Sequence, residues 1–166
     1  MMVTISRQAG AGGDEIARRL AGELQWNFLD KEALERLLAE RGFPKAEVEI
    51  FDEKKPGLWH RFSAERERYL HFLKMVSYEF ARRGSCVMVG RGGQLIFGNL
   101  PGALCVQVVA PLQKRIEATR EKLGYDERRA RHVVHHEDNE RAGFHRFFFH
   151  AHWDAPDLYD LVINVE

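Results

Sequence analysis

Short apolar runs alternate along this chain with longer segments in which apolar residues recur every three or four positions. The runs are rich in Val, Ile and Leu and end at turn-forming or polar residues, which predicts buried strands. Because apolar and polar residues do not alternate within them, the pattern favours a parallel sheet covered on both faces. We expect strands at Met2–Ser6, Cys86–Gly90, Leu104–Ala110 and Leu161–Val165, with a weaker one at Trp26–Leu29.

Helical periodicity fills the segments between these runs. Apolar residues with this spacing follow the first run at Ile16, Leu20 and Leu24. A strand followed by a helix, repeated along the chain, predicts an α/β fold. With 166 residues, the chain has the length of a single domain, residues 1–166, and we expect its first strand to lie at the centre of the sheet.

The stretch from 42 to 63 interrupts this regular pattern. It contains Pro44, Pro56 and Gly57 among mixed charges, and its apolar residues show little periodicity. Such a segment is typical of an irregular connection or a small insertion at the edge of a sheet.

Composition and charge argue against several functional classes. Lys plus Arg and Asp plus Glu number 25 each, so the net charge is zero and gives no overall attraction to nucleic acid or to an anionic membrane. The chain shows no secretion signal, and no apolar run approaches the roughly 18 residues of a membrane span, so we expect a cytoplasmic protein. Arginine outnumbers lysine by 18 to 7, which favours phosphate or carboxylate ligands.

A glycine-rich turn follows the first expected strand directly. The residues RQAGAGG lead from this strand into an amphipathic helix that begins near Asp14. Backbone N–H groups in such a turn, beside the positive end of a helix dipole, form a concave site that suits phosphate. A simple tight turn between a strand and a helix is the alternative.

This turn departs from the standard P-loop, GxxxxGK[ST]. Aligning the final glycine of the motif with Gly12 puts Arg7 at its first glycine. Gly13 then stands in the lysine position and Asp14 in the Ser/Thr position, so both side-chain contacts to the ligand are missing. A carboxylate there repels phosphate unless a cation intervenes. Asp14 is therefore expected either to cap the helix or to replace the hydroxyl as a magnesium ligand.

Five separated stretches of the chain occur in the order in which one family carries them. They are VTISRQAGAGGDEIARRLA near the N-terminus, FLDKE at 28–32, FDEKKP at 51–56, CVMVGRGG at 86–93 and WDAPDLYDLVIN at 153–164. Together they resemble the cytidylate kinase-like family, a branch of the P-loop nucleoside monophosphate kinases. The resemblance implies a three-layer α/β P-loop kinase-like fold with a mainly parallel five-stranded sheet, an acceptor-side insertion at 42–63 and a lid-like helical region at 111–152.

The activity that this resemblance implies is transfer of the γ-phosphoryl group of ATP, with Mg²⁺, to a pyrimidine nucleoside monophosphate such as CMP. The family also carries glycine in place of the P-loop lysine, and we hypothesise that Arg7 or Lys31 supplies the missing charge. Asp14 is a departure, because a basic residue is expected at that position. The implied phosphate-binding residues are Gly10, Ala11, Gly12, Gly13, Asp14 and Glu15.

The resemblance also implies residues for the acceptor and for the lid. Arg91 falls where an acceptor phosphate is held, and Gly92 replaces the aspartate of cytidylate kinases. Asp138 and Arg141 match a D-x-x-R pattern that contacts the acceptor nucleotide, with an ion pair inside one helix as the alternative. Residues 113–131 hold seven basic and four acidic side chains, which fits a lid over phosphate or a solvated helix. Its candidate arginines are Arg115, Arg120, Arg128 and Arg131.

Two other functions stay open on the sequence. A catalytically degenerate relative that binds a nucleotide or a protein partner without turnover would show the same missing lysine and hydroxyl. A metal-binding or sensor protein would use His132 and His136, which lie one helical turn apart with Glu137 or Asp138 nearby, a spacing that suits zinc or nickel.

The last expected strand lies close to the end of the sequence, at a point where related kinases continue into a helix that covers the sheet. A strand without that cover exposes apolar surface. We therefore expect a second copy of the chain, as a homodimer, or a different partner chain to cover this strand.

Overall fold

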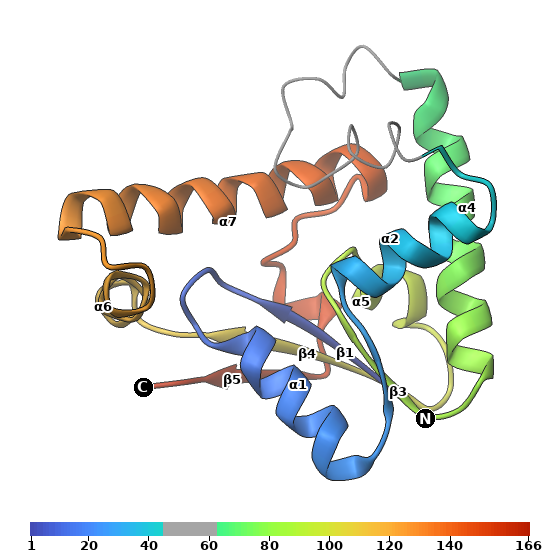
Figure 1. Ribbon diagram of the computed structural model, residues 1–166, viewed down its shortest axis with the longest axis horizontal. Helices are drawn as coiled ribbons and strands as arrows, with labels where there is room; N and C mark the ends of the chain where they lie inside the picture. Colours follow the sequence, from blue (N-terminus) through green and yellow to red (C-terminus); the bar gives the residue numbers. More distant parts are fainter. Residues whose placement is uncertain (45–62) are drawn as a thin grey trace.

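The computed structural model describes residues 1–44 and 63–166, and in them a five-stranded sheet lies between helices (Figure 1). Its strands are β1 (Met2–Arg7), β2 (Asn27–Leu29), β3 (Cys86–Val89), β4 (Ala103–Val109) and β5 (Leu161–Asn164). Every neighbouring pair is parallel, in the order β2-β3-β1-β4-β5. The predicted α/β fold, its parallel sheet and its central first strand are therefore confirmed.

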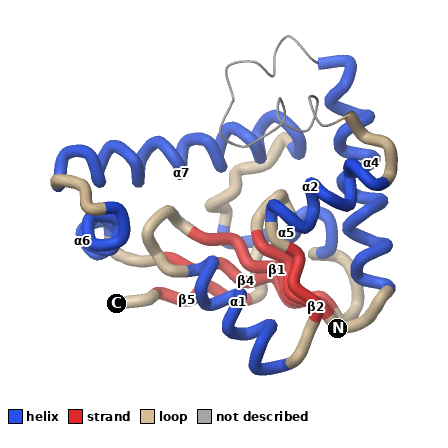
Figure 2. Tube along the Cα trace, viewed as in Figure 1, coloured by secondary structure: helices blue, strands red, loops and turns tan. Residues whose placement is uncertain are grey.

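The periodic segment with Ile16, Leu20 and Leu24 forms a helix, as predicted, and Figure 2 shows how the helices of the described residues surround the sheet. The predicted insertion at 42–63 lies outside the described residues except for 42–44 and 63. None of the helices in the described part of the chain is both long and apolar enough to cross a membrane. The helices are α1 (Gly13–Leu24), α2 (Lys31–Glu40), α4 (Ser63–Arg82), α5 (Gly93–Phe97), α6 (Leu112–Leu123) and α7 (Glu127–Phe149).

The pleat of the strands divides the core into two layers. Val3 and Ile5 of β1 pack with Ala17 and Ala21 of α1 on one face of the sheet. Met2, on the opposite face of the same strand, belongs to a second cluster with residues of α2, α4, α5 and α7. Because residues two apart in a strand share a face, this alternation produces the three-layer arrangement.

The outer strand β5 leaves apolar surface exposed. Leu161 is 47% and Val162 is 46% exposed, and Leu104 on the adjacent β4 is 40% exposed. The expected exposed apolar strand is thus present. A partner for it, either a second copy or another chain, stays a prediction.

Candidate functional site

The turn between β1 and α1 has the backbone conformation of a phosphate-binding loop. Gly10 and Gly12 adopt left-handed conformations, with φ of 78° and 76°, which favour glycine. The backbone N–H groups of Gly10, Gly12 and Gly13 have no hydrogen-bond acceptor within the described residues. They lie at the N-terminus of α1, where the helix dipole is positive, so the loop is suited to bind an anion.

A cavity of about 290 Å³ opens beside this loop, which is close to the lower end of the usual size of small-ligand pockets. Figure 1 shows α7 passing over the loop, with α6 beside it. The walls of the cavity, which we call the loop cavity, include Gly10, Asp14 and Glu15 of the loop and α1, Thr119 and Lys122 of α6, and Glu137 and Arg141 of α7.

Asp14 binds Arg7 and does not cap the helix. The Arg7 guanidinium reaches both carboxylate oxygens of Asp14, with Nη2–Oδ1 at 2.8 Å and Nε–Oδ2 at 3.1 Å. Helix α1 begins at Gly13 and its N-cap residue is Gly12, so the predicted capping role is wrong because Asp14 lies inside the first turn. Burial opposes ionisation of Asp14, but the neighbouring Arg7 charge holds the pKa of this carboxyl below its ordinary value.

Position 13 has no room for a side chain. A Cβ on Gly13 would lie 2.9 Å from Cγ of Arg7 and closer still to its Cβ. The glycine that stands in place of the P-loop lysine is therefore matched to Arg7, whose side chain packs against the start of α1. Of the two residues hypothesised to replace the lysine, Arg7 is in contact with the loop.

Lys31 and Arg91 meet at a different place. Both contact Glu35, with Lys31 Nζ 3.8 Å and Arg91 Nη2 3.3 Å from its Oε1 atom. Arg91 is buried, has a left-handed φ of 52° and lies over the Phe144 ring. The contacts of Lys31 thus join it to the predicted acceptor turn.

The glycine that follows Arg91 has no space for the aspartate of cytidylate kinases. A Cβ on Gly92 would lie 3.2 Å from Cδ2 of Phe149 and closer to two other atoms of that ring. Its φ of 71° also favours glycine. Phe149 therefore fills the place from which the aspartate side chain would extend.

Asp138 and Arg115 fasten the loop to the two helices above it. The Asp138 carboxylate accepts a hydrogen bond from the Ala9 N–H at 2.8 Å and pairs with Arg115 Nη1 at 2.6 Å. Arg115 also donates to the carbonyl oxygens of Ala9 and Ala110. Both side chains are mostly buried, at 19% and 9% exposed. We call Ala9, Arg115 and Asp138 the loop clamp.

Arg141 stands on the wall of the loop cavity and is paired with two acids of its own helix. Its Nη1 lies 3.2 Å from Asp138, and its Nη2 lies 3.2 Å from Glu137. The intrahelical ion pair that the sequence left as an alternative is therefore present. Arg141 and its acidic partners lie beside the phosphate loop, whereas Arg91, the other arginine predicted to bind the acceptor, contacts Glu35 of α2.

Two predicted groups lie away from the loop cavity. Arg120 lines a separate shallow depression on α6 together with Glu117 and Glu121. The His132 and His136 rings stack at 5.9 Å, and His136 pairs with Glu140. Among the described residues no three His, Cys, Asp or Glu side chains are placed to hold a metal ion, so the structure provides no third ligand for the histidine pair.

Lys122 is a charged residue of the cavity that the sequence reasoning missed. It lies seven residues after Arg115, which corresponds to about 20° around an α-helix, whereas Arg120 lies about 140° away. Once Arg115 is placed against the loop, the same helix face carries Thr119 and Lys122 toward the cavity. The spacing of seven residues between Arg115 and Lys122 was the signal in the sequence that both lie on one face of the helix.

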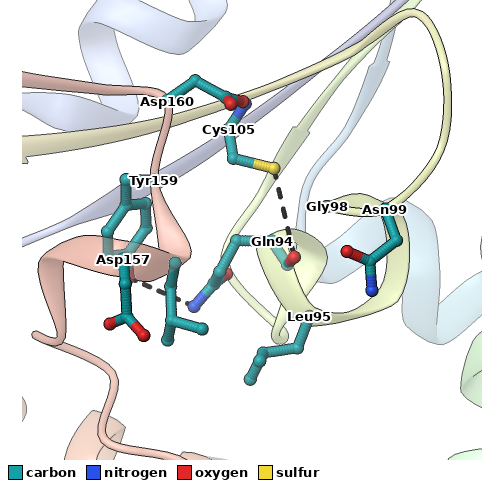
Figure 3. A pocket seen from close by; sticks show the side chains of 9 residues that line it. Gln94, Leu95, Gly98, Asn99, Cys105, Asp157, Tyr159 and Asp160 are labelled. Carbon is teal, nitrogen blue, oxygen red and sulfur yellow. Dashed lines mark hydrogen bonds between the residues drawn. The ribbon is translucent and has the colours of Figure 1, made fainter.

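A second cavity of about 160 Å³ lies between α5 and the segment before β5 (Figure 3). Gln94 donates a hydrogen bond to the Tyr159 hydroxyl at 3.1 Å, and the Cys105 N–H donates to Asp160 at 2.7 Å. Burial raises the pKa of Tyr159 to about 12, so its hydroxyl stays protonated at neutral pH and donates to the Trp153 carbonyl. These polar groups bind one another, and the loop cavity is the candidate site.

Comparison with known proteins agrees with the family resemblance. The profile of a family described as cytidylate kinase-like matches residues 2–166. Among curated proteins, uronate isomerase from Corynebacterium glutamicum is 36% identical over 78 residues, which are 47% of this chain. This chain spans only 15% of the length of that protein.

Solved structures show the same architecture over nearly the whole chain. A protein from Eubacterium ventriosum, described as uncharacterized, has a TM-score of 0.76 at 22% identity, covering 99% of this chain and 88% of that one. Shikimate kinase from Bacteroides thetaiotaomicron has a TM-score of 0.53 at 14% identity, covering 99% and 86%. Shikimate kinase from Acinetobacter baumannii has a TM-score of 0.52 at 17% identity, covering 99% and 83%. At these identities the likeness shows the fold, which is that of P-loop kinases.

Proposed function

The chain belongs to the cytidylate kinase-like family, and from this premise we propose that it binds ATP in the loop cavity and transfers the γ-phosphoryl group to a nucleoside monophosphate. Family membership and the kinase fold support a nucleotide-binding phosphotransferase. The observation that carries the proposal is the phosphate loop itself, in which three backbone N–H groups find no acceptor among residues 1–44 and 63–166, beside a cavity at the start of α1. A pyrimidine acceptor such as CMP is the finer part of the proposal.

The chemistry asks mainly for positioning and for neutralisation of phosphate charge. The loop N–H groups hold the phosphates of the donor, and Arg7, whose Cβ and Cγ pack against position 13, neutralises the Asp14 carboxylate beside them. Arg91 would hold the acceptor phosphate. No general base is required, because the attacking oxygen of an acceptor phosphate is already ionised.

The residues at the loop also fit a magnesium ion. Asp14 and Glu15 line the cavity with carboxylate oxygens, the ligand type that Mg²⁺ prefers, and Asp14 is ionised and 56% exposed. We propose that these two carboxylates hold the ion. When bound, Mg²⁺ supplies neutralisation of the phosphate charge.

Calorimetric titration with ATP and Mg²⁺, followed by a coupled phosphoryl-transfer assay across nucleoside monophosphates, tests the function. We expect saturable ATP binding and the highest turnover with a pyrimidine monophosphate. Arg7→Ala should weaken ATP binding. Lys31→Ala removes a side chain that shares Glu35 with Arg91, and should raise the KM of the acceptor. Absence of nucleotide binding would overturn the proposal, and unchanged affinity and turnover in both variants would remove these residues from the site.

The charge of Asp14 should oppose phosphate when no metal is present. We expect Asp14→Asn to strengthen binding of metal-free ATP about two- to fivefold, since exposed charges interact weakly in water. It should also make ATP affinity less dependent on Mg²⁺. Titrations with EDTA and with Mg²⁺ measure both effects, and Glu23→Gln, which removes an exposed acid elsewhere on α1, is the matched control. Weaker metal-free binding by Asp14→Asn would contradict the prediction.

A second function, nucleotide binding without turnover, is favoured by two specific contacts. The Asp14 carboxylate forms an ion pair with the Arg7 guanidinium, and Phe149 fills the place of the acceptor-side aspartate. The same pair of experiments separates the two functions, because a degenerate kinase would bind ATP in the titration and show no transfer to any monophosphate.

A further inference from the structure

The cations around the loop cavity differ in whether they already have acidic partners. Arg141 is paired with both Glu137 and Asp138. Arg7, behind the loop, is paired with both oxygens of Asp14. Lys122 lines the same cavity and makes no ion pair with the described residues. Its positive charge is therefore available to a ligand.

The position of Lys122 is fixed by the loop clamp. Arg115 is buried and bonded to the loop, which sets the rotation of α6 about its axis. A Cβ on Gly10 would lie 3.0 Å from Cα of Arg115 and closer still to its carbonyl oxygen, so α6 packs directly on the loop. Two turns later on the same face, Lys122 lies on the cavity wall contributed by α6, and Asp14 lies on the wall contributed by α1.

Electrostatics agree with this placement. Burial raises the pKa of Asp14, but the Arg7 charge and hydrogen bond lower it, and the positive charges of Arg141 and Lys122 add smaller lowering effects, so the pKa lies below its ordinary value. A lysine that acts on Asp14 across the cavity also acts on phosphate bound at the adjacent loop.

We propose that Lys122 binds the phosphate chain of the nucleotide from the α6 side of the loop cavity and supplies the positive charge that position 13 has no room to carry. The inference rests on the proposed function and adds the residue that replaces the P-loop lysine. A lysine suits this role because its compact ammonium group ends a flexible four-carbon chain. The recognised ligand class is a nucleoside di- or triphosphate.

Titration calorimetry with ADP and with ATP, each with Mg²⁺, on four variants tests this role. We expect Lys122→Ala to weaken binding of both nucleotides at least about tenfold, as for loss of a charge-assisted hydrogen bond. Lys122→Glu should weaken it further, and Lys122→Arg should restore most of it. Lys114→Ala removes an exposed lysine of the same helix that does not line the cavity, and should change affinity less than about twofold.

A second readout separates phosphate contact from a general change of the helix. Affinity of the wild-type protein should fall with added salt more steeply than that of Lys122→Ala, because one ionic contact has been removed. If the wild type binds nucleotide and Lys122→Ala binds it as tightly as Lys114→Ala, the role of Lys122 is overturned while the proposed function stands. If the wild type binds no nucleotide, the proposed function fails and the role of Lys122 fails with it.

Discussion

Replacing Gly13 by lysine, the residue of the standard P-loop, is expected to impair this protein rather than to improve it. Any side chain at position 13 meets the Arg7 side chain, whose Cγ would lie 2.9 Å from the new Cβ. Overpacking of this kind costs about 1–3 kcal/mol of unfolding free energy. Relief of the clash would push Arg7 away from Asp14 and distort the first turn of α1. We expect ATP affinity to fall at least about tenfold, equivalent to about 1.4 kcal/mol.

A second substitution at position 7 should rescue the Gly13→Lys variant only if it removes the Cβ atom of that residue. Because the clash begins at Cβ of Arg7, Arg7→Ala should not make room for the lysine, whereas Arg7→Gly should. Urea denaturation and ATP titration of Gly13→Lys, alone and with each change at position 7, measure the effect. Gly22→Ala, in open space on the same helix, is the control and should leave stability equal or higher. Tighter ATP binding by Gly13→Lys alone would contradict the prediction.

Replacing Asp138 by alanine is expected to cause the largest loss of stability in the candidate site. The carboxylate accepts the Ala9 N–H and pairs with Arg115 and Arg141. Its removal leaves a mostly buried guanidinium at Arg115 without its anion, and breaking such a pair costs about 3 kcal/mol or more. The loop also loses its attachment to α7. Urea denaturation should therefore show the loss, and nucleotide binding should weaken with it.

An exposed ion pair on the same helix provides the control for this experiment. Glu127→Ala breaks the pair with Arg131, whose two side chains are 52% and 44% exposed, and should cost less than about 1 kcal/mol. Asp138→Asn retains an oxygen that can accept the Ala9 N–H. Its loss of stability should therefore lie between the losses for Glu127→Ala and Asp138→Ala. A loss below about 1 kcal/mol for Asp138→Ala would show that the loop clamp does not hold the loop.

Local patterns in the sequence were sufficient for the fold. The four runs rich in Val, Ile and Leu, together with the weaker run at 26–29, predicted the five strands to within one residue at either end. Continuous apolarity suits the inner strands of the sheet, which are covered on both faces. The glycine cluster after β1 predicted the phosphate loop, because left-handed backbone at Gly10 and Gly12 favours glycine. Both are properties that neighbouring residues determine among themselves.

The partners of the charged side chains were decided only by the tertiary structure. Ala9 and Asp138 are separated by 129 positions and still share a hydrogen bond, and no local pattern records such a contact. Asp14 matched a helix cap by its position, yet the neighbouring Arg7 binds it. Arg120 and Lys122 are equally charged in the sequence, but the rotation of α6, fixed by Arg115, brings only Lys122 to the loop cavity. Whether a segment forms a helix or a strand follows from its local periodicity. Which charged side chains contact one another depends on how elements distant in the sequence pack.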